Sequence, residues 1–187
     1  MIKVFIAGPR AVSNLDELVK ERLLNILKKN FKVIIGDAKG VDKIIQEYFF
    51  SLDYKNVKIY ASNGKARNNI GNWEVEKVNV INGLTGFDFF AAKDKEMANV
   101  ADYGFMIWNG QSKGTLNNVI NLLKQSKKTL MYFIPEKNFY CIDKIEDLKK
   151  IIYKCDSKTK KMFETLISTQ KKPSIEIKEQ LLFEKTS

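Results

Sequence analysis

Histidine is absent from the 187-residue chain, and only two cysteines occur, Cys141 and Cys155. Without histidine, the chain lacks both the general base of a Ser-His-Asp triad and the imidazole ligands common in zinc sites. Two cysteines without Cys-x-x-Cys spacing provide neither a disulfide framework nor a thiolate metal site. We therefore expect no bound metal and no histidine-based catalysis, and no motif calls for a cofactor.

Long apolar runs are also missing. The longest, residues 105–108 and 130–134, are far shorter than the roughly 20 residues that cross a bilayer. The N-terminal apolar segment ends at Gly8-Pro9, before any pattern typical of signal-peptide cleavage. We therefore expect a cytoplasmic protein without a membrane partner. Hydrophobic residues still make up 44% of the chain, which is enough for one globular domain.

Arginine is scarce in an otherwise basic chain. Lysine and arginine total 32 against 22 acidic residues, a net charge of +10, yet only Arg10, Arg22 and Arg67 are arginines. A basic surface attracts phosphate groups and would suit nucleic acid. Base readout favours the arginine fork, however, and dispersed lysines commonly serve solvation. We therefore expect an anionic small ligand and do not expect nucleic acid as the partner.

Apolar runs alternate with segments of helical periodicity, which predicts an α/β protein with a parallel sheet. The expected strands are residues 2–7, 32–35, 57–60, 103–108 and 129–134, with a further short strand at 139–142. The expected helices cover 15–27, 41–51, 92–100, 116–124 and 145–153. The order predicts a Rossmann-like three-layer α/β/α fold with a mostly parallel sheet of about five strands. We interpret the polar stretch 61–73 and the less periodic segment up to residue 90 as a long loop or insertion.

The C-terminal part of the chain is rich in lysine and weakly periodic. We expect a ligand-binding domain over residues 1–155 and a helical extension or tail over 156–187. The sequence leaves open whether the extension packs on the domain.

Small and polar residues follow the expected strands, at the edge of a parallel sheet where ligands bind. Glycines at 36, 40, 110 and 114 would let backbone amides approach phosphate oxygens, and Ser112 and Thr115 add hydroxyl groups. Each feature also has a purely structural interpretation. The glycines could serve tight turns, Ser112 or Thr115 could cap a helix, and Trp73 could be core. Asp37, Asp42 and Asp94 could likewise be charges at helix ends.

The combined motifs resemble the SLOG superfamily, and within it the small stand-alone YspA-like bacterial proteins. The resemblance covers about residues 2–134. It is carried by Gly8-Pro9-Arg10, Gly36-Asp37-Ala38-x-Gly40-x-Asp42, Arg67-Asn68-x-x-Gly71-x-Trp73, Lys93-Asp94-x-x-Met97 with Ala101-Asp102-Tyr103-Gly104, and Trp108-x-Gly110-x-Ser112-x-Gly114-Thr115-x-x-Asn118. The resemblance implies a Rossmann-like fold, a nucleotide or ADP-ribose-like ligand at the carboxyl edge of the sheet, and a homodimer or homotetramer.

Two departures from the family pattern bear on activity. The hydrolase branch of the SLOG superfamily carries a glutamate three residues after the threonine that corresponds to Thr115. This chain has Asn118 at that position. An amide cannot act as a carboxylate nucleophile or stabilise an oxocarbenium ion by charge. If the chain cleaves N-glycosidic bonds, Asp94 is the best substitute, followed by Asp37 and Asp42. Pro9 stands where the family has serine and removes both a hydroxyl and an amide donor.

We expect a protein that binds a nucleotide-derived ligand, such as ADP-ribose, a cyclic ADP-ribose isomer, NAD or a nucleoside monophosphate, as a sensor, carrier or sequestering protein. The first alternative is an N-ribosyl hydrolase or transferase with Asp94 as the catalytic carboxylate, and the second is DNA binding like that of DprA. The candidate ligand-binding residues are Gly8, Arg10, Gly36, Asp37, Gly40, Asp42, Arg67, Asn68, Trp73, Lys93, Asp94, Gly110, Ser112, Gly114, Thr115 and Asn118.

Overall fold

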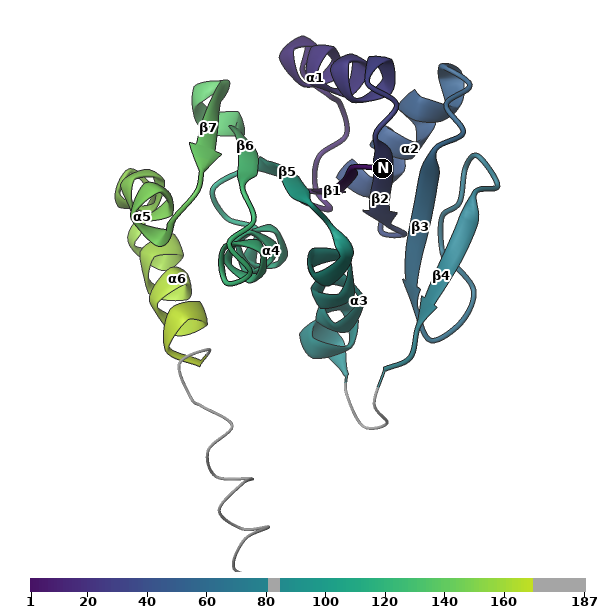
Figure 1. Cartoon of the computed structure of the whole chain (residues 1–187). Coiled ribbons are helices and arrows are strands. Elements are labelled where there is room, and N and C mark those ends of the chain that lie inside the picture. Colours follow the sequence, from purple (N-terminus) through teal and green to yellow (C-terminus); the bar gives the residue numbers. More distant parts are fainter. Residues whose placement is uncertain (81–84, 170–187) are drawn as a thin grey trace, which may run out of the picture.

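The computed structural model describes residues 1–80 and 85–169 (Figure 1). The strands are β1 (Lys3–Ala7), β2 (Lys32–Gly36), β3 (Val57–Ser62), β4 (Glu74–Val78), β5 (Tyr103–Trp108), β6 (Thr129–Phe133) and β7 (Asn138–Ile142). The helices are α1 (Glu17–Lys28), α2 (Val41–Ser51), α3 (Gly86–Val100), α4 (Lys113–Leu123), α5 (Ile145–Tyr153) and α6 (Ser157–Thr169), with a 3₁₀ turn, η1, at Ile134–Glu136. The predicted α/β class is confirmed.

The strands form one seven-stranded sheet in the order β4-β3-β2-β1-β5-β6-β7. All neighbouring pairs are parallel except β6 and β7. The five expected strands and the additional short one are therefore present, while β4 lies in the segment that we interpreted as a loop. The sequence of β4 is Glu-Val-Glu-Lys-Val, and none of its residues is buried. An exposed edge strand needs no apolar run, which is why hydrophobicity did not reveal it.

Helices cover both faces of the sheet, as the three-layer prediction requires. Figure 1 shows α1 and α2 on one side of the sheet and α3 and α4 on the other. Val19 and Leu23 of α1 share a buried cluster with Ile45 and Phe49 of α2. On the opposite face, Met97 of α3 packs in a second cluster, together with residues of α4, α5 and α6. The sheet thus separates two apolar layers, and burial of their side chains away from water stabilises the fold.

Helix α6 is part of this second layer. It contacts α4 and α5, and its Phe163 and Leu166 are buried in the same cluster. The boundary expected after residue 155 therefore does not coincide with a break in packing. Residues 170–187 of the expected extension lie outside the described part of the chain. Among the described helices, none is both long and apolar enough to cross a bilayer.

The direction of the strand order reverses beside β1. From β1 the chain adds β2, β3 and β4 on one side, and then returns to place β5 on the other side of β1. Neighbouring loops consequently leave β1 and β5 toward opposite faces, which opens a crevice at their carboxyl ends. This crevice is the position at which open α/β sheets bind ligands.

Candidate functional site

A cavity of about 630 Å³ occupies this crevice, a volume suited to a small ligand. Three segments form its walls: the turn after β1, the loop between β5 and α4, and one side of α3. The lining residues include Gly8, Arg10, Asp42, Phe87, Phe90, Lys93, Asp94, Met97, Asn109, Ser112, Gly114, Thr115 and Asn118. Nine of the sixteen predicted site residues are among these, so segments far apart in the sequence converge as expected.

The wall formed by α4 presents hydrogen-bond donors. Ser112 is the N-cap, and its hydroxyl accepts hydrogen bonds from the amide of Thr115 at 3.3 Å and from the Thr115 hydroxyl at 2.9 Å. Asn109 Oδ1 accepts a hydrogen bond from the Ser112 amide at 2.9 Å. The first two helical amides, of Lys113 and Gly114, have no acceptor within the helix. Together with the helix dipole, these amides favour an anion at this end of the cavity.

The wall formed by the β1 turn carries Arg10. The turn is held from behind, because the Val41 amide donates to the Pro9 carbonyl at 3.1 Å. A Cβ on Gly8 would lie 2.7 Å from the Val41 side chain, so this contact requires glycine. Arg10 stacks over the Phe90 ring at 4.8 Å, and among the described residues it has no ion-pair partner. Its charge therefore remains available to a ligand.

The floor of the cavity contains a buried lysine among carboxylates. Lys93 of α3 is 4% exposed, and its Nζ lies 2.7 Å from Asp94 Oδ1 and 4.0 Å from Asp37 Oδ1. Asp42 is also buried and accepts a hydrogen bond from the Ala38 amide at 3.2 Å. Among the described residues, no group of three histidines, cysteines or acidic residues is arranged to hold a metal ion. The ammonium group of Lys93 supplies the positive charge in this cluster.

Burial and charge act in opposite directions on these groups. For Asp42, burial is the largest influence and, with the charges of Asp94 and Asp37, raises its pKa to about 7 against the attraction of Lys93. For Lys93, burial also acts most strongly and lowers the pKa, but Asp94, Asp42 and Asp37 together outweigh it. The pKa of Lys93 is therefore raised, and the lysine stays charged at neutral pH.

Asn118 offers an acceptor on the cavity floor. The side chain is 2% exposed, and its Nδ2 donates to Asp94 Oδ2 at 3.4 Å. Within the described residues its Oδ1 has no hydrogen-bond partner. Reversing the amide would place its oxygen against the Asp94 carboxylate, so the charge of Asp94 fixes the orientation. Because buried polar atoms are normally paired, the free Oδ1 is suited to accept a donor from a bound ligand.

Arg67, Asn68 and Asp37 lie behind the cavity and support it. Arg67 donates to Asp37 through Nη2 at 2.6 Å, Nε at 2.9 Å and its backbone amide at 3.1 Å, while Asn68 Nδ2 donates to the Asp37 carbonyl at 2.8 Å. Burial acts to raise the pKa of Asp37, but the hydrogen bonds and charge of Arg67 and the charge of Lys93 hold it below its ordinary value. We predicted that Arg67 contacts the ligand; in the structure, Asp37 accepts hydrogen bonds from two of its side-chain nitrogens.

Gly36 and Gly40 do not line the cavity, although we predicted that both contact the ligand. A Cβ on Gly36 would lie 2.5 Å from Asp42 Oδ2 and 2.7 Å from Lys93 Nζ, so glycine makes room for the buried cluster. Gly40 has φ +76°, and a Cβ there would lie 2.5 Å from the Arg10 carbonyl oxygen. Both glycines therefore shape the site through neighbouring residues.

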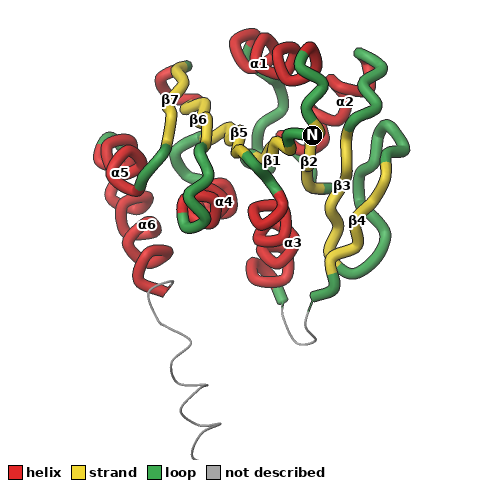
Figure 2. The backbone as a smooth tube through the Cα atoms, viewed as in Figure 1, coloured by secondary structure: helices red, strands yellow, loops and turns green. Residues whose placement is uncertain are grey.

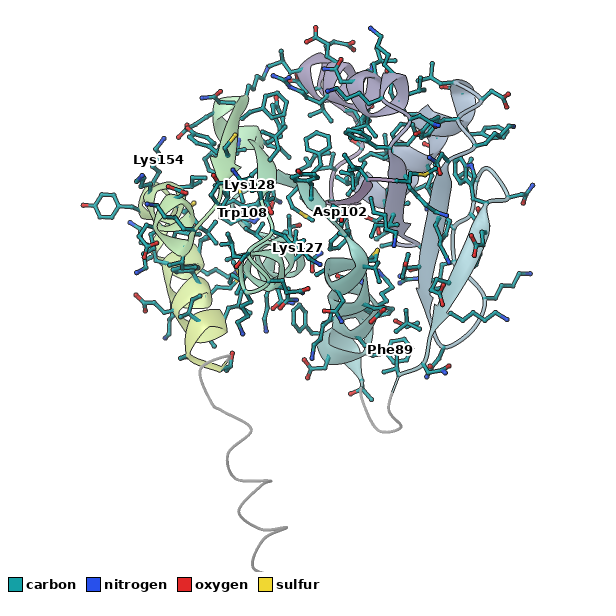
Figure 3. All side chains as sticks on the ribbon, in the orientation of Figure 1. Phe89, Asp102, Trp108, Lys127, Lys128 and Lys154 are labelled. Carbon is teal, nitrogen blue, oxygen red and sulfur yellow. The ribbon has the colours of Figure 1, made fainter. Side chains whose placement is uncertain are left out.

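Gly110 and Trp73 also lie outside the cavity lining. Gly110 has φ +79°, and its carbonyl accepts a hydrogen bond from the Thr159 hydroxyl of α6 at 2.7 Å. Trp73 is 8% exposed in the core beside α2, and its Nε1 donates to the Tyr54 carbonyl at 3.0 Å. The interpretation of Trp73 as a core residue is therefore correct, and the alternative prediction that it contacts the ligand is not supported. Trp108, labelled in Figure 3, is core as well.

Helix α3 starts earlier than its sequence pattern predicted. The helix begins at Gly86, whereas we expected residue 92, and it brings Phe87 and Phe90 to the cavity. Phe87, Phe90, Ala91 and Asp94 follow a helical spacing that could have revealed this. The hydrophobicity pattern is indistinct there because the aromatic side chains face the cavity, and only Lys93, Met97 and Ala98 are buried.

No protein-family model matches the chain, and no curated protein matches it. A solved structure of DNA processing protein A from Helicobacter pylori, which describes a single-stranded DNA binding mode, matches with a TM-score of 0.55. The sequences are 16% identical, and the match covers 90% of this chain and 81% of the other. At this identity the likeness concerns the fold alone. The chain therefore shares a Rossmann-like α/β fold with that protein.

Proposed function

We propose that the protein binds a phosphorylated, nucleotide-derived small ligand in the cavity between β1 and β5, as a sensor, carrier or sequestering protein. The observation that carries this proposal is that Arg10, which has no ion-pair partner among the described residues, meets the amino end of α4 at Gly114 in one cavity. The first amides of that helix have no acceptor within the helix. A phosphate there would accept charge-assisted hydrogen bonds from Arg10 and bonds from the amides. Ligands of this class include AMP, ADP-ribose, its cyclic isomers and NAD.

The floor of the cavity suits a sugar. Asn118 Oδ1 and Asp94 Oδ2 are acceptors in the same cavity, and one of them has no partner within the described residues. Hydroxyl groups of a ribose could donate to both. A ligand with phosphate at one end and hydroxyl donors at the other would match the donors of α4 and the acceptors of the floor. This arrangement supports the SLOG resemblance; the narrower YspA-like assignment is part of the proposal.

Calorimetric titration with AMP, ADP-ribose, cyclic ADP-ribose isomers and NAD tests the proposal. Arg10→Gln removes the free charge and should weaken binding of the best ligand about tenfold to a hundredfold, the worth of a hydrogen bond to a charged group. Arg22→Gln is the matched control, because Arg22 also stacks on a phenylalanine, Phe139, but does not line the cavity. Binding that is absent, or equally affected by both changes, would refute the proposal.

Single-stranded DNA is the second candidate ligand, although from the sequence we did not expect nucleic acid as the partner. The structural neighbour is described for binding single-stranded DNA, and this chain carries a net charge of +10. An oligonucleotide that contacts several phosphates should lose affinity steeply with salt, with a slope of about −0.7 per contact in a log–log plot. A shallow slope, together with tighter binding of a mononucleotide, would favour the small ligand.

N-glycosidic cleavage remains the enzymatic alternative, and Asp94 is the observation that favours it. Its carboxylate lines the cavity with one oxygen bound to Lys93 and the other to Asn118. Analysis of the titrated samples for released base or ribose phosphate distinguishes binding from turnover. If turnover occurs, Asp94→Asn should abolish it and leave binding measurable.

A further inference from the structure

One side of α3 forms a continuous wall of the cavity. Phe87, Phe90, Ala91, Asp94 and Met97 all line it, at spacings of three or four residues that place them on one helix face. The two aromatic rings come first along this wall, and the carboxylate and methionine follow. Phe87 is 38% exposed, and Phe90 is half-buried. The aromatic part of the wall therefore lies in the first turns of α3, before the carboxylate of Asp94.

Two cations, Arg10 and Lys113, form cation–π contacts with these rings. Lys113 Nζ lies 4.3 Å from the centre of the Phe87 ring, and Arg10 Cζ lies 4.8 Å from that of Phe90. Arg67 Cζ lies 4.5 Å from the Phe90 ring but is held by Asp37. Arg10 and Lys113 have no carboxylate partner within the described residues, so the aromatic rings are their main contacts.

These contacts can be exchanged for contacts with a nucleotide. An exposed cation–π contact of this kind is weaker than a charge-assisted hydrogen bond between a cation and a phosphate. A phosphate would therefore draw Arg10 and Lys113 toward itself. The aromatic faces that they leave would then be open to a planar ring. The same cavity thus offers a phosphate position and a stacking surface next to each other.

We propose that Phe87 and Phe90 form the base-binding subsite, on which a nucleobase stacks while its phosphate binds Arg10 and the start of α4. This inference rests on the proposed function and narrows it. The affinity should come in large part from the base, so that the ligand is a nucleotide and not a sugar phosphate. Because every base has an aromatic face, stacking alone discriminates weakly between bases.

The test compares AMP with ribose 5-phosphate, which has the same phosphate and sugar but lacks the base. The wild-type protein should bind AMP at least tenfold more tightly than ribose 5-phosphate. Phe87→Leu and Phe90→Leu keep an apolar side chain and favour a helix, but they remove the ring. Each should reduce AMP affinity about fivefold to a hundredfold, the range for loss of one base stack. The affinity for ribose 5-phosphate should change less than twofold.

Phe50→Leu is the matched control, because Phe50 is 56% exposed on α2 and lies outside the cavity lining. A 2-aminopurine nucleotide gives a direct readout, since stacking quenches its fluorescence; quenching should weaken in the Phe87 and Phe90 variants only. Equal affinity for AMP and ribose 5-phosphate, or an AMP preference that survives both changes, overturns the subsite and leaves the proposed function intact. If neither ligand binds, the proposed function fails and the subsite fails with it.

Discussion

Arg67 holds the buried Asp37 by a two-point ion pair, with Nη2 and Nε at 2.6 and 2.9 Å from the two carboxylate oxygens. The two residues are 30 positions apart in the sequence, so the pair fastens the loop after β3 to the end of β2. Because β3 and β4 are parallel, this loop must run back along the sheet (Figure 2). The ion pair thus closes a long connection next to the cavity.

Arg67→Gln should therefore destabilise the protein. The change leaves the charge of Asp37, which is 3% exposed, with the backbone amide of residue 67 at 3.1 Å as a donor and the more distant Lys93 at 4.0 Å as its charged partner. Because 41% of the Arg67 side chain is exposed, solvent offsets part of the loss. We expect the free energy of unfolding to fall by about 1–3 kcal/mol in urea titrations. Lys65→Gln, in the same loop, is the control, and equal stability of the two variants would contradict the prediction.

Stability should depend on pH through Asp42, whose pKa burial raises to about 7. An aspartate in an unfolded chain titrates at about 3.9, so between these values the folded state holds a proton that the unfolded state has lost. The contribution of Asp42 to stability is therefore fully present below about pH 4 and is lost as the pH rises through 7. The slope is at most about 1.4 kcal/mol per pH unit.

Asp42→Asn removes this titration and serves as the comparison. Urea unfolding at pH 5, 6, 7 and 8 should show wild-type stability falling relative to the variant as the pH rises, with the difference levelling off above pH 7. Taking the difference cancels the other groups that titrate in both proteins. A wild-type stability that rises relative to the variant across this range would show that Asp42 is ionised in the folded state.

The sequence predicted those parts of the fold that bury apolar residues. The strands around β1 are continuous apolar runs because helices cover both their faces. Ser112 is the N-cap of α4 and also lines the cavity, so the structural and functional interpretations of that residue do not exclude each other. The local sequence pattern was sufficient to predict a strand or a helix cap where the neighbouring residues in the sequence determine that structure.

Features that depend on contacts between distant segments could not be predicted. The Asp37–Arg67 pair and the role of Gly36 both arise from residues brought together by the fold. In the edge strand β4, Glu74 and Glu76 form ion pairs with Lys58 of β3. In the sequence, a short segment with such charges looks like a polar loop. The first turns of α3 were missed because their aromatic residues face a cavity.

Two glycine substitutions should have opposite effects. Gly36→Ala places a methyl group 2.5 Å from Asp42 Oδ2 and 2.7 Å from Lys93 Nζ, inside a buried cluster that must then shift. We expect a loss of about 1–3 kcal/mol in the free energy of unfolding. Gly114→Ala meets no atom within 4 Å and lies in the first turn of α4, so it should gain about 0.5–1 kcal/mol. Thermal melts of both variants check the pair, and the same sign in both would be inconsistent with these environments.

Thr159 connects α6 to the loop between β5 and α4, because its hydroxyl donates to the Gly110 carbonyl at 2.7 Å in a buried position. Thr159→Val keeps the shape of the side chain but leaves that carbonyl without its donor, which should cost about 1–3 kcal/mol. Thr159→Ser retains the hydroxyl and should be nearly neutral. Thr165→Val, on the exposed side of the same helix, removes only a local bond to the Lys161 carbonyl and is the matched control.

Hydrogen exchange adds a readout that a general loss of stability would not produce. In Thr159→Val, amides of residues 109–112 should exchange faster than those of β6, because the loop between β5 and α4 loses its anchor. Ligand affinity should fall with it, since the Ser112 cap and the free amides of α4 follow this loop directly. If exchange rises uniformly across the sheet, or if the Thr165→Val control behaves in the same way, α6 does not position the loop. Faster exchange confined to residues 109–112 would instead show that α6 positions the loop that carries the ligand site.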